Sequence, residues 1–276
     1  MTTMTTLRTV LNYICRFYYF LFDRLVLYPM VKHLAEQIDV KFLNLGYMPH
    51  DDEKGIFKVV DSVIEPSDPI RAHTYLYEKT LSMCPVYPNL KKMKLLEVGC
   101  GPGAGVQWIR RVHSEIDSVK GLDRVVVDFM EGSIIQGDAE KLPFSKNEFD
   151  MIVNVESSHL YADSQQFFKE CARVLKKGGF LCWADVRYSV LMIQAEKQAA
   201  EAGLHLVNFE NITEGVLRGI NYTSYRYDKL VQKAPWYVRL FSNSLRTTYC
   251  APGTESHKRL LKREKIYATA CWKKVI

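Results

Sequence analysis

The chain has 276 residues, of which 47% are hydrophobic and 25% are charged, a composition typical of a folded globular protein that excludes a disordered or fibrous chain. Its net charge of +6 is mild: it favours an anionic membrane surface or an acidic ligand, and nucleic acid is not predicted as a partner. Seven cysteines without a Cys-x-x-Cys pair or a metal-like Cys/His spacing predict reduced, mostly buried thiols, no metal site and a cytoplasmic location.

The N-terminal stretch 7–31 is apolar and aromatic, but four charged residues interrupt it: Arg8, Arg16, Asp23 and Arg24. A membrane-spanning helix needs about 20 largely uncharged residues, so a span is not predicted. No small-residue cleavage site follows the apolar part, which argues against a secretory signal. The interpretation is an amphipathic helix that packs on its own domain, with peripheral contact to a membrane as the alternative.

From Lys94 onward, short apolar runs alternate with helical patterns. The runs predicted as strands are 94–98, 118–122, 133–136, 149–154, 179–184, 204–209 and 266–272. The helical patterns between them include 165–176, which Gly178-Gly179 is predicted to end, and 186–203. This alternation predicts an α/β fold with a doubly wound, mostly parallel sheet of seven strands.

Three regions follow from this pattern. Residues 1–90 are predicted as a helical N-terminal cover, and residues 91–276 as the ligand-binding domain. Residues 212–247, which mix helix and loop, are predicted as a cap inserted before the last strand.

The stretch KLLEVGCGPGAGVQW, residues 94–108, combines the end of a predicted strand with four glycines. Glycines let the chain turn sharply and let a ligand approach the backbone, and the following helix directs its N-terminal N–H groups at that ligand. In parallel sheets, ligands bind at this carboxyl end of the strands. The stretch therefore predicts a ligand-binding loop, with a plain glycine-rich loop as the alternative.

Acidic residues after neighbouring strands indicate which ligand binds. Asp123 ends the second strand, where an acid can hold ribose hydroxyls of either a nicotinamide dinucleotide or S-adenosylmethionine. Glu97 would repel a pyrophosphate but can engage an ammonium group, and Asp138 can accept from an adenine amino group. The acids favour a ligand with a methionine end, although Asp123 and Asp138 could also merely cap turns.

The motifs EVGCGPG, GLD, GDAEKLPF and FDMIVNVE resemble those of the seven-strand S-adenosylmethionine-dependent methyltransferases. FLNLGY, NVESSHLY and KKGGFLCWADVR are similar to the branch of the phthiotriol/phenolphthiotriol dimycocerosates methyltransferases, which O-methylate lipid alcohols, and the resemblance runs from about residue 42 to the C-terminus. It implies S-adenosyl-L-methionine as cofactor. The residues implied to bind its methionine end are Glu97, Gly99, Cys100, Gly101 and Gly103. Asp123 is implied to bind the ribose, Asp138 and Ala139 the adenine, and Asn154 is implied to line the methyl-donor region.

A hydroxyl that accepts a methyl group gains from a base that takes its proton. His159, just past the fourth strand, is the candidate base because histidine titrates near neutral pH; the alternative is a loop histidine without a catalytic role. Glu156 is a second candidate base or orients the same loop, with a solvated acid as its alternative. Tyr161 is expected in the pocket wall.

Aromatic residues gather in the N-terminal helices and in 212–247, which the core fold does not need. They include Tyr18, Tyr19, Phe20, Phe22, Tyr222, Tyr225, Tyr227, Trp236 and Tyr237. Two aromatic covers favour a lipid-like or other apolar small molecule as acceptor, although core packing accounts for any single aromatic. The basic stretch 257–265 is interpreted as a solvated helix face, with contact to acidic lipid headgroups as the alternative.

One feature departs from the resemblance. Only 14 residues separate Asp123 from Asp138, which leaves nine, 124–132, for a crossover that normally holds a full helix. Three hypotheses follow: a methyltransferase that acts on oxygen, a non-catalytic protein of the same fold, and a nicotinamide-dependent oxidoreductase. The oligomeric state is left open.

Overall fold

The computed structural model of the chain describes residues 42–53, 55–125, 133–234, 236–239 and 242–275. The predicted helix over 7–31 and most of the crossover 124–132 lie outside the described residues. Phe42–Ile276 form one compact unit. Among the described helices, none combines the length and the apolar character that crossing a bilayer requires.

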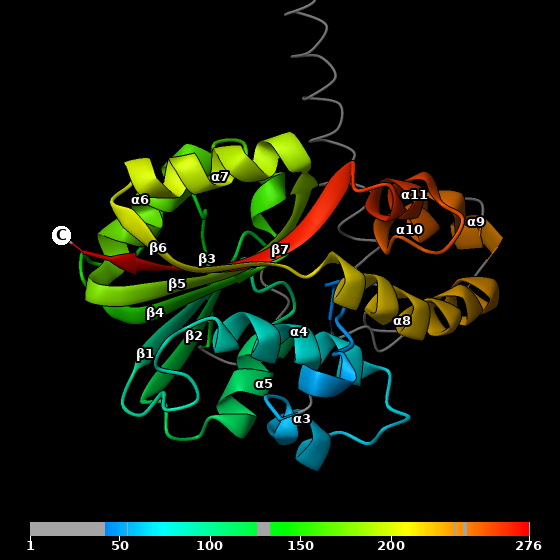
Figure 1. Cartoon of the computed structure of the whole chain (residues 1–276), viewed down its shortest axis with the longest axis horizontal. Helices are drawn as coiled ribbons and strands as arrows, with labels where there is room; N and C mark the ends of the chain where they lie inside the picture. Colours follow the sequence, from blue (N-terminus) through cyan, green and yellow to red (C-terminus); the bar gives the residue numbers. More distant parts are fainter. Residues whose placement is uncertain (1–41, 54, 126–132, 235, 240–241, 276) are drawn as a thin grey trace, which may run out of the picture. The chain divides into compact units, whose positions relative to one another are not determined.

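Seven strands form one sheet in the order β3-β2-β1-β4-β5-β7-β6 (Figure 1). Their bounds are β1 Lys94–Val98, β2 Ser118–Asp123, β3 Ile134–Gln136, β4 Phe149–Val155, β5 Leu175–Tyr188, β6 Leu204–Asn211 and β7 Lys265–Lys274. The first five strands pair in parallel, and β7 runs antiparallel to both β5 and β6. The predicted mostly parallel sheet of seven strands is thereby confirmed.

Helices cover both faces of the sheet (Figure 1). One face carries α3 Lys58–Val63, α4 Ile70–Ser82 and α5 Ala104–Val112, and the other carries α6 Ser164–Val174 and α7 Ser189–Glu201. α6 shows why these segments are helical: Asp163 accepts from the Gln166 N–H at its start, and Phe167, Cys171 and Val174 form one buried stripe. The sheet is therefore doubly wound, as predicted.

Between β6 and β7 the chain forms α8 Thr213–Lys233, α9 Trp236–Arg239, α10 Ser242–Thr248 and α11 Glu255–Leu261. These helices lie beside the sheet at the amino end of β7 (Figure 1). Two short 3₁₀ helices complete the described elements, η2 Asp51–Glu53 and η3 Ser158–Leu160. The segment predicted as a cap is thus helical and precedes the last strand, while its role as a cap stays a prediction.

The predicted helix end at Gly178-Gly179 is wrong. α6 ends at Val174 and β5 begins directly at Leu175. The register between β4 and β5 shifts there, because Phe149 faces Leu175 whereas Met151 faces Phe180. The extra residues of β5 form a bulge, and Gly178 takes its left-handed φ of +83° inside that bulge and not at a helix end.

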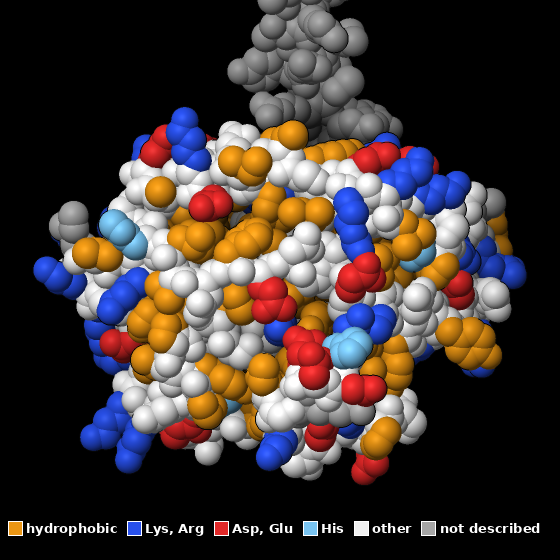
Figure 2. Space-filling model, viewed as in Figure 1, with side chains coloured by type: hydrophobic (Ala, Val, Ile, Leu, Met, Phe, Trp, Pro, Cys, Tyr) orange, Lys and Arg blue, Asp and Glu red, His pale blue; other side chains and the backbone are white. Residues whose placement is uncertain are grey.

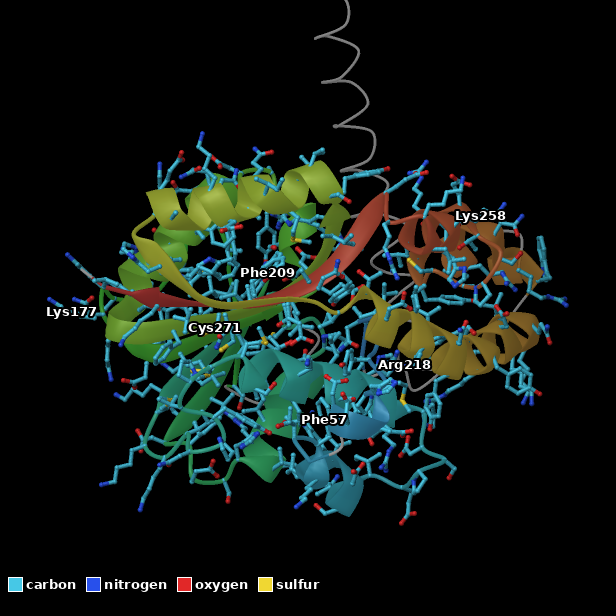
Figure 3. All side chains as sticks on the ribbon, in the orientation of Figure 1. Phe57, Lys177, Phe209, Arg218, Lys258 and Cys271 are labelled. Atoms are coloured by element: carbon cyan, nitrogen blue, oxygen red, sulfur yellow. The ribbon has the colours of Figure 1, made fainter. Side chains whose placement is uncertain are left out.

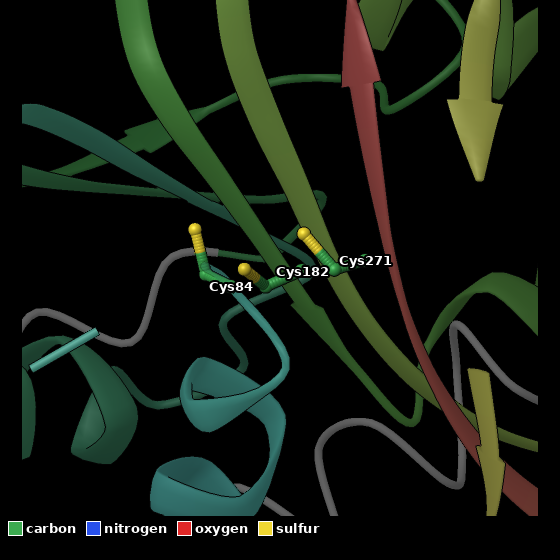
Figure 4. A group of neighbouring side chains, drawn as sticks. All are labelled: Cys84, Cys182 and Cys271. Carbon is green, nitrogen blue, oxygen red and sulfur yellow. The ribbon is translucent and has the colours of Figure 1, made fainter. Parts of the chain in front are cut away.

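Three buried cysteines lie close together in the core (Figure 4). Cys182 of β5 and Cys271 of β7 are register partners, and the Sγ atoms of both and of Cys84 lie within 4.8 Å of one another. In the described part of the chain this group has no fourth metal-capable side chain, and the fourfold coordination of a structural zinc site would need one. All described cysteines are free and buried, as small apolar core residues are.

Candidate active site

The glycine loop connects β1 to α5 at the carboxyl edge of the sheet. Its backbone is anchored to β2: the N–H groups of Gly99 and Cys100 donate to the Leu122 carbonyl at 2.8 and 3.1 Å. The Gly101 N–H donates to Asp123 Oδ2 at 2.8 Å. The structure therefore brings the predicted methionine-end residues and the predicted ribose acid into direct contact.

Glu97 lies under this loop with 1% of its surface exposed. The Tyr77 hydroxyl donates to Glu97 Oε1 at 2.5 Å, whereas Oε2 has no hydrogen-bond partner among the described residues. Burial raises the pKa of Glu97 to about 8; the charge of Asp123 acts in the same direction and the Tyr77 hydrogen bond opposes it. Gly105 allows this arrangement, because a Cβ there would lie 2.2 Å from the Tyr77 hydroxyl.

Asn154 is fully buried at the end of β4, the strand next to β1. Its Nδ2 donates to the Val98 carbonyl at 2.8 Å and to Ser157 Oγ at 2.7 Å, but in the part of the chain that the structure describes its Oδ1 has no partner. Buried acceptors without a donor are rare in folded proteins. Two of them, Glu97 Oε2 and Asn154 Oδ1, lie on neighbouring strands and face opposite sides of the sheet, so separate N–H donors of a bound ligand would satisfy them.

The turn after β4 contacts the glycine loop. Ser157 Oγ and the Tyr161 hydroxyl lie 2.9 Å apart, and Asn154 Nδ2 donates to both at 2.7 and 3.2 Å. A Cβ at Gly99 would lie 2.3 Å from Ser157 Oγ and 2.7 Å from the Tyr161 hydroxyl. Only glycine therefore allows the loop and this turn to pack so closely, and the turn carries His159.

Two further predicted residues occupy local turns. Asp123 also accepts from the Val125 N–H at 3.0 Å, and it is half-buried. Asp138 is exposed and accepts from the Glu140 N–H at 2.9 Å, while Ala139 beside it is buried. The contact of Asp138 is one that a turn-forming aspartate makes, so its adenine role stays a prediction.

His159 is paired with a carboxylate that the sequence analysis missed. Its Nδ1 lies 2.6 Å from Oδ1 of Asp185, which is completely buried in β5, while 29% of the His159 side chain is exposed. Burial alone would lower the pKa of His159, but the charge and hydrogen bond of Asp185 outweigh it and raise that pKa. Asp185 is 26 residues from His159, so the spacing gave no signal; a charged residue inside the apolar run of β5 was the one hint.

Neighbouring side chains hold Asp185 in its charged form. Ser158 Oγ donates to Asp185 Oδ2 at 2.6 Å and itself accepts from Trp183 Nε1 and Arg187 Nη2, each at 2.8 Å. Arg187 Nη2 also lies 3.4 Å from Asp185 Oδ2. Although burial acts in the opposite direction, His159 and Arg187 keep the pKa of Asp185 below its usual value.

Glu156 connects the site to two distant segments. Its Oε2 accepts from the Leu45 N–H at 2.8 Å and from the Tyr267 hydroxyl at 2.9 Å. Burial raises the pKa of Glu156 to about 7, against these hydrogen bonds and the charge of His159. Of its two predicted roles, these contacts fit the residue that orients the loop better than the base.

A family model for a methyltransferase domain matches residues 96–183. A phthiotriol/phenolphthiotriol dimycocerosates methyltransferase of Mycobacterium leprae is 31% identical over 224 residues, which cover 77% of this chain and 78% of that protein. A fatty-acid O-methyltransferase of Mycolicibacterium smegmatis is 32% identical over 212 residues, 73% of each chain. Geranyl diphosphate C-methyltransferase of Streptomyces coelicolor A3(2), solved with S-adenosyl-L-homocysteine, shares the fold: its TM-score is 0.56 at 13% identity, over 88% of this chain and 93% of that chain.

The strand order, the glycine loop and the matched domain together define an S-adenosylmethionine-dependent methyltransferase. Within that class, the chain belongs to the family of the phthiotriol/phenolphthiotriol dimycocerosates methyltransferases and their relatives. S-adenosyl-L-methionine is therefore the cofactor, and the nicotinamide-dependent alternative loses its support. Its α-ammonium group is the kind of donor that Glu97 Oε2 lacks among the described residues.

Proposed function

We propose that the protein transfers a methyl group to a hydroxyl oxygen of a lipid-like, apolar small molecule, with His159 as the general base. The pairing of His159 with buried Asp185, in the turn that packs on Gly99, is the observation that carries the proposal. The names of the relatives support the acceptor class, since one is a phthiotriol/phenolphthiotriol dimycocerosates methyltransferase and another a fatty-acid O-methyltransferase.

When bound, S-adenosyl-L-methionine supplies an activated methyl group. Glu97 would hold its ammonium group through its unpartnered oxygen, beside the backbone of the loop 99–103, and Asn154 would line the methyl-donor region. Asp123 would hold the ribose, and Asp138 with Ala139 would border the adenine. These assignments extend the contacts of the glycine loop to the ligand that fits it.

His159 would take the proton of the acceptor hydroxyl. Its Nδ1–H donates to Asp185, which fixes the tautomer and leaves the lone pair of Nε2 free to accept a proton. As the hydroxyl oxygen gains the methyl group, its proton passes to Nε2, and the imidazolium that forms is stabilised by Asp185. Ser158 and Arg187 hold Asp185 in place for this step.

The acceptor would approach the glycine loop past Leu43, in the segment 42–48 that packs directly on α8, so that the predicted N-terminal cover and the cap insertion 212–247 both lie beside it. Leu43 lies 3.5 Å from where a Cβ of Gly101 would be, and 57% of it is exposed. Tyr227 of α8 donates to His73 Nε2 at 2.8 Å, whereas Tyr225 and Trp236 are exposed on the outside. Peripheral membrane contact by residues 7–31, outside the described part, remains a prediction.

Methyl transfer from labelled cofactor to a long-chain alcohol and to a fatty acid tests the proposal. A carboxylate is already ionised at pH 7, so it needs no base, whereas an alcohol does. We expect transfer to the alcohol, with a large loss in His159→Ala. Transfer to the fatty acid alone, or transfer to the alcohol that His159→Ala leaves unchanged, would show that the hydroxyl assignment is wrong. The absence of any transfer would favour the non-catalytic hypothesis.

A further inference from the structure

α7 has an apolar outer surface at its beginning. Met192, Ala195 and Ala199 face the core, as expected for a helix that covers a sheet. The residues on the other side of its first turns are also apolar, and with the last residue of β5 they form the α7 patch: Tyr188 (38% exposed), Val190 (74%), Leu191 (42%) and Ile193 (72%). Farther along α7 the exposed residues include Glu196 and Lys197, as is normal for an outer face. Figure 2 shows hydrophobic side chains at the surface over this helix.

A basic segment adjoins the α7 patch. Ser189, at the start of α7, donates to two backbone carbonyls of this segment, which comprises residues 255–265. Its N–H donates to the Glu264 carbonyl at 3.1 Å, and its Oγ donates to the Arg263 carbonyl at 2.7 Å. Arg259 Nη1 donates to the Tyr188 hydroxyl at 2.5 Å, and Lys265 Nζ lies 5.0 Å from the centre of the same ring. Residues 255–265, the basic turn, contain five Lys or Arg and two Glu, and its Lys258 and Lys262 are exposed.

The α7 patch lies on the edge of the sheet that carries the proposed base. Tyr188 ends β5 three residues after Asp185, the partner of His159. Leu160, the neighbour of His159, is itself 73% exposed. An acceptor with long apolar chains resides in a lipid phase, so an enzyme that docks by this edge would meet it without moving it through water.

We propose that the α7 patch and the basic turn dock the protein on an anionic lipid surface. Apolar side chains beside Lys and Arg are the combination that binds such surfaces, because the first enter the headgroup region and the second attract anionic lipids. A second copy of the chain fits less well, since pairing through the patch would bring two basic turns together. The benefit of docking for reaching an apolar acceptor rests on the proposed function, whereas the docking surface itself is argued from the exposed residues alone.

Co-sedimentation of the full chain with vesicles tests the proposal. Vesicles of phosphatidylcholine alone are compared with vesicles that contain phosphatidylserine. Val190→Ser with Ile193→Ser should weaken binding to the anionic vesicles about tenfold or more. Lys258→Gln with Lys262→Gln should weaken it by about 25-fold at low salt and little at high salt.

Matched controls lie outside the α7 patch and the basic turn. Leu206→Ser removes an exposed apolar side chain of β6 beside Trp272, and Lys177→Gln removes an exposed charge far from Lys258 (Figure 3). Both should bind vesicles as the unaltered chain does. If the patch and turn variants bind like these controls, or if they abolish only self-association measured by sedimentation velocity, the docking proposal is wrong.

Transfer to a short, water-soluble alcohol separates this proposal from the proposed function. The patch and turn variants should retain that activity, because none of their residues belongs to the proposed site. A chain that methylates no alcohol but loses vesicle binding in these variants would refute the proposed function and leave the docking surface intact. A loss of short-alcohol activity equal to the loss of vesicle binding would instead indicate that the substitutions damage the fold, and the docking assignment would fall.

Discussion

His159 and Asp185 form a pair in which each side chain sets the protonation state of the other. The charge and hydrogen bond of Asp185 outweigh burial and raise the pKa of His159 above its usual value. A base acts only in its neutral form, so methyl transfer to an alcohol should increase with pH through this pKa and level off above it. A pH–rate profile whose midpoint lies above about 6.5 would confirm this, and a flat profile from pH 5 to 8 would contradict it.

Removing the imidazole tests the base directly. His159→Ala should lower the turnover of an alcohol by about 10²–10⁴ and leave cofactor binding nearly intact, since the ring pairs with Asp185 of β5 and the glycine loop is anchored to β2. Turnover and calorimetric binding of S-adenosyl-L-methionine measure the two effects. His205→Ala, which removes an exposed histidine of β6, is the control and should change neither. A loss below about fivefold would reduce His159 to a loop residue.

Asp185 acts through His159, so its variant needs a readout beyond stability. Asp185→Asn keeps the shape of the side chain but removes the charge that raises the pKa of His159. The midpoint of the pH–rate profile should therefore move to lower pH, while the plateau rate falls about tenfold or more. A variant that loses thermal stability but keeps the midpoint would show that Asp185 is only a structural residue.

At the scale of elements, the junction of the glycine loop with the turn after β4 depends on Gly99. Gly99→Ala would place a Cβ 2.3 Å from Ser157 Oγ at a φ of +72°. Gly178→Ala is the matched control, because Gly178 has a similar φ of +83° and no atom within 4 Å. Gly99→Ala should destabilise the protein by about 1–3 kcal/mol more than the control and weaken cofactor binding. Equal thermal unfolding and binding in both variants would contradict the close packing inferred here.

The elements themselves were largely predictable, because apolar runs in a parallel sheet are continuous and the glycines punctuate them. All seven strands lie where the sequence placed them, although β5 is longer than predicted at both ends. The error at Gly178 has a clear cause. A glycine pair in the sequence is equally typical of a helix end and of a bulge, because both need a left-handed φ. Only the register of β5 against β4 distinguishes the two.

At the scale of the whole molecule, sequence reasoning identified residues that lie close together along the chain. It missed side chains from distant segments that only the fold brings together. Glu97, Gly99 and Asp123 lie at or just after strand ends, and their place at the glycine loop could be predicted from that position. Asp185 could not, because its partner is 26 residues away, and the thiol cluster combines residues from three separate segments. The short crossover 124–132 stays a prediction, since most of it lies outside the described residues.

Glu97 makes the stability of the whole protein depend on pH and on cofactor. Its pKa is raised from 4.5 to about 8 in the folded state, so the folded chain holds one more proton than the unfolded chain between these values. Stability then falls as the pH rises through this window, because unfolding releases that proton. The side chain in the Glu97→Gln variant cannot ionise. The melting temperature of this variant minus that of the unaltered chain should therefore increase from pH 5 to pH 8.

Two comparisons make this outcome specific to Glu97. Glu170 has a lowered pKa, held mainly by Arg173, so Glu170→Gln should show no such trend over the same pH range. S-adenosyl-L-methionine should abolish the trend in the unaltered chain if its ammonium group pairs with the ionised Glu97, since the charge is then compensated. Thermal melts at each pH, with and without cofactor, measure both. A trend that persists unchanged with saturating cofactor would mean that the ammonium group binds elsewhere.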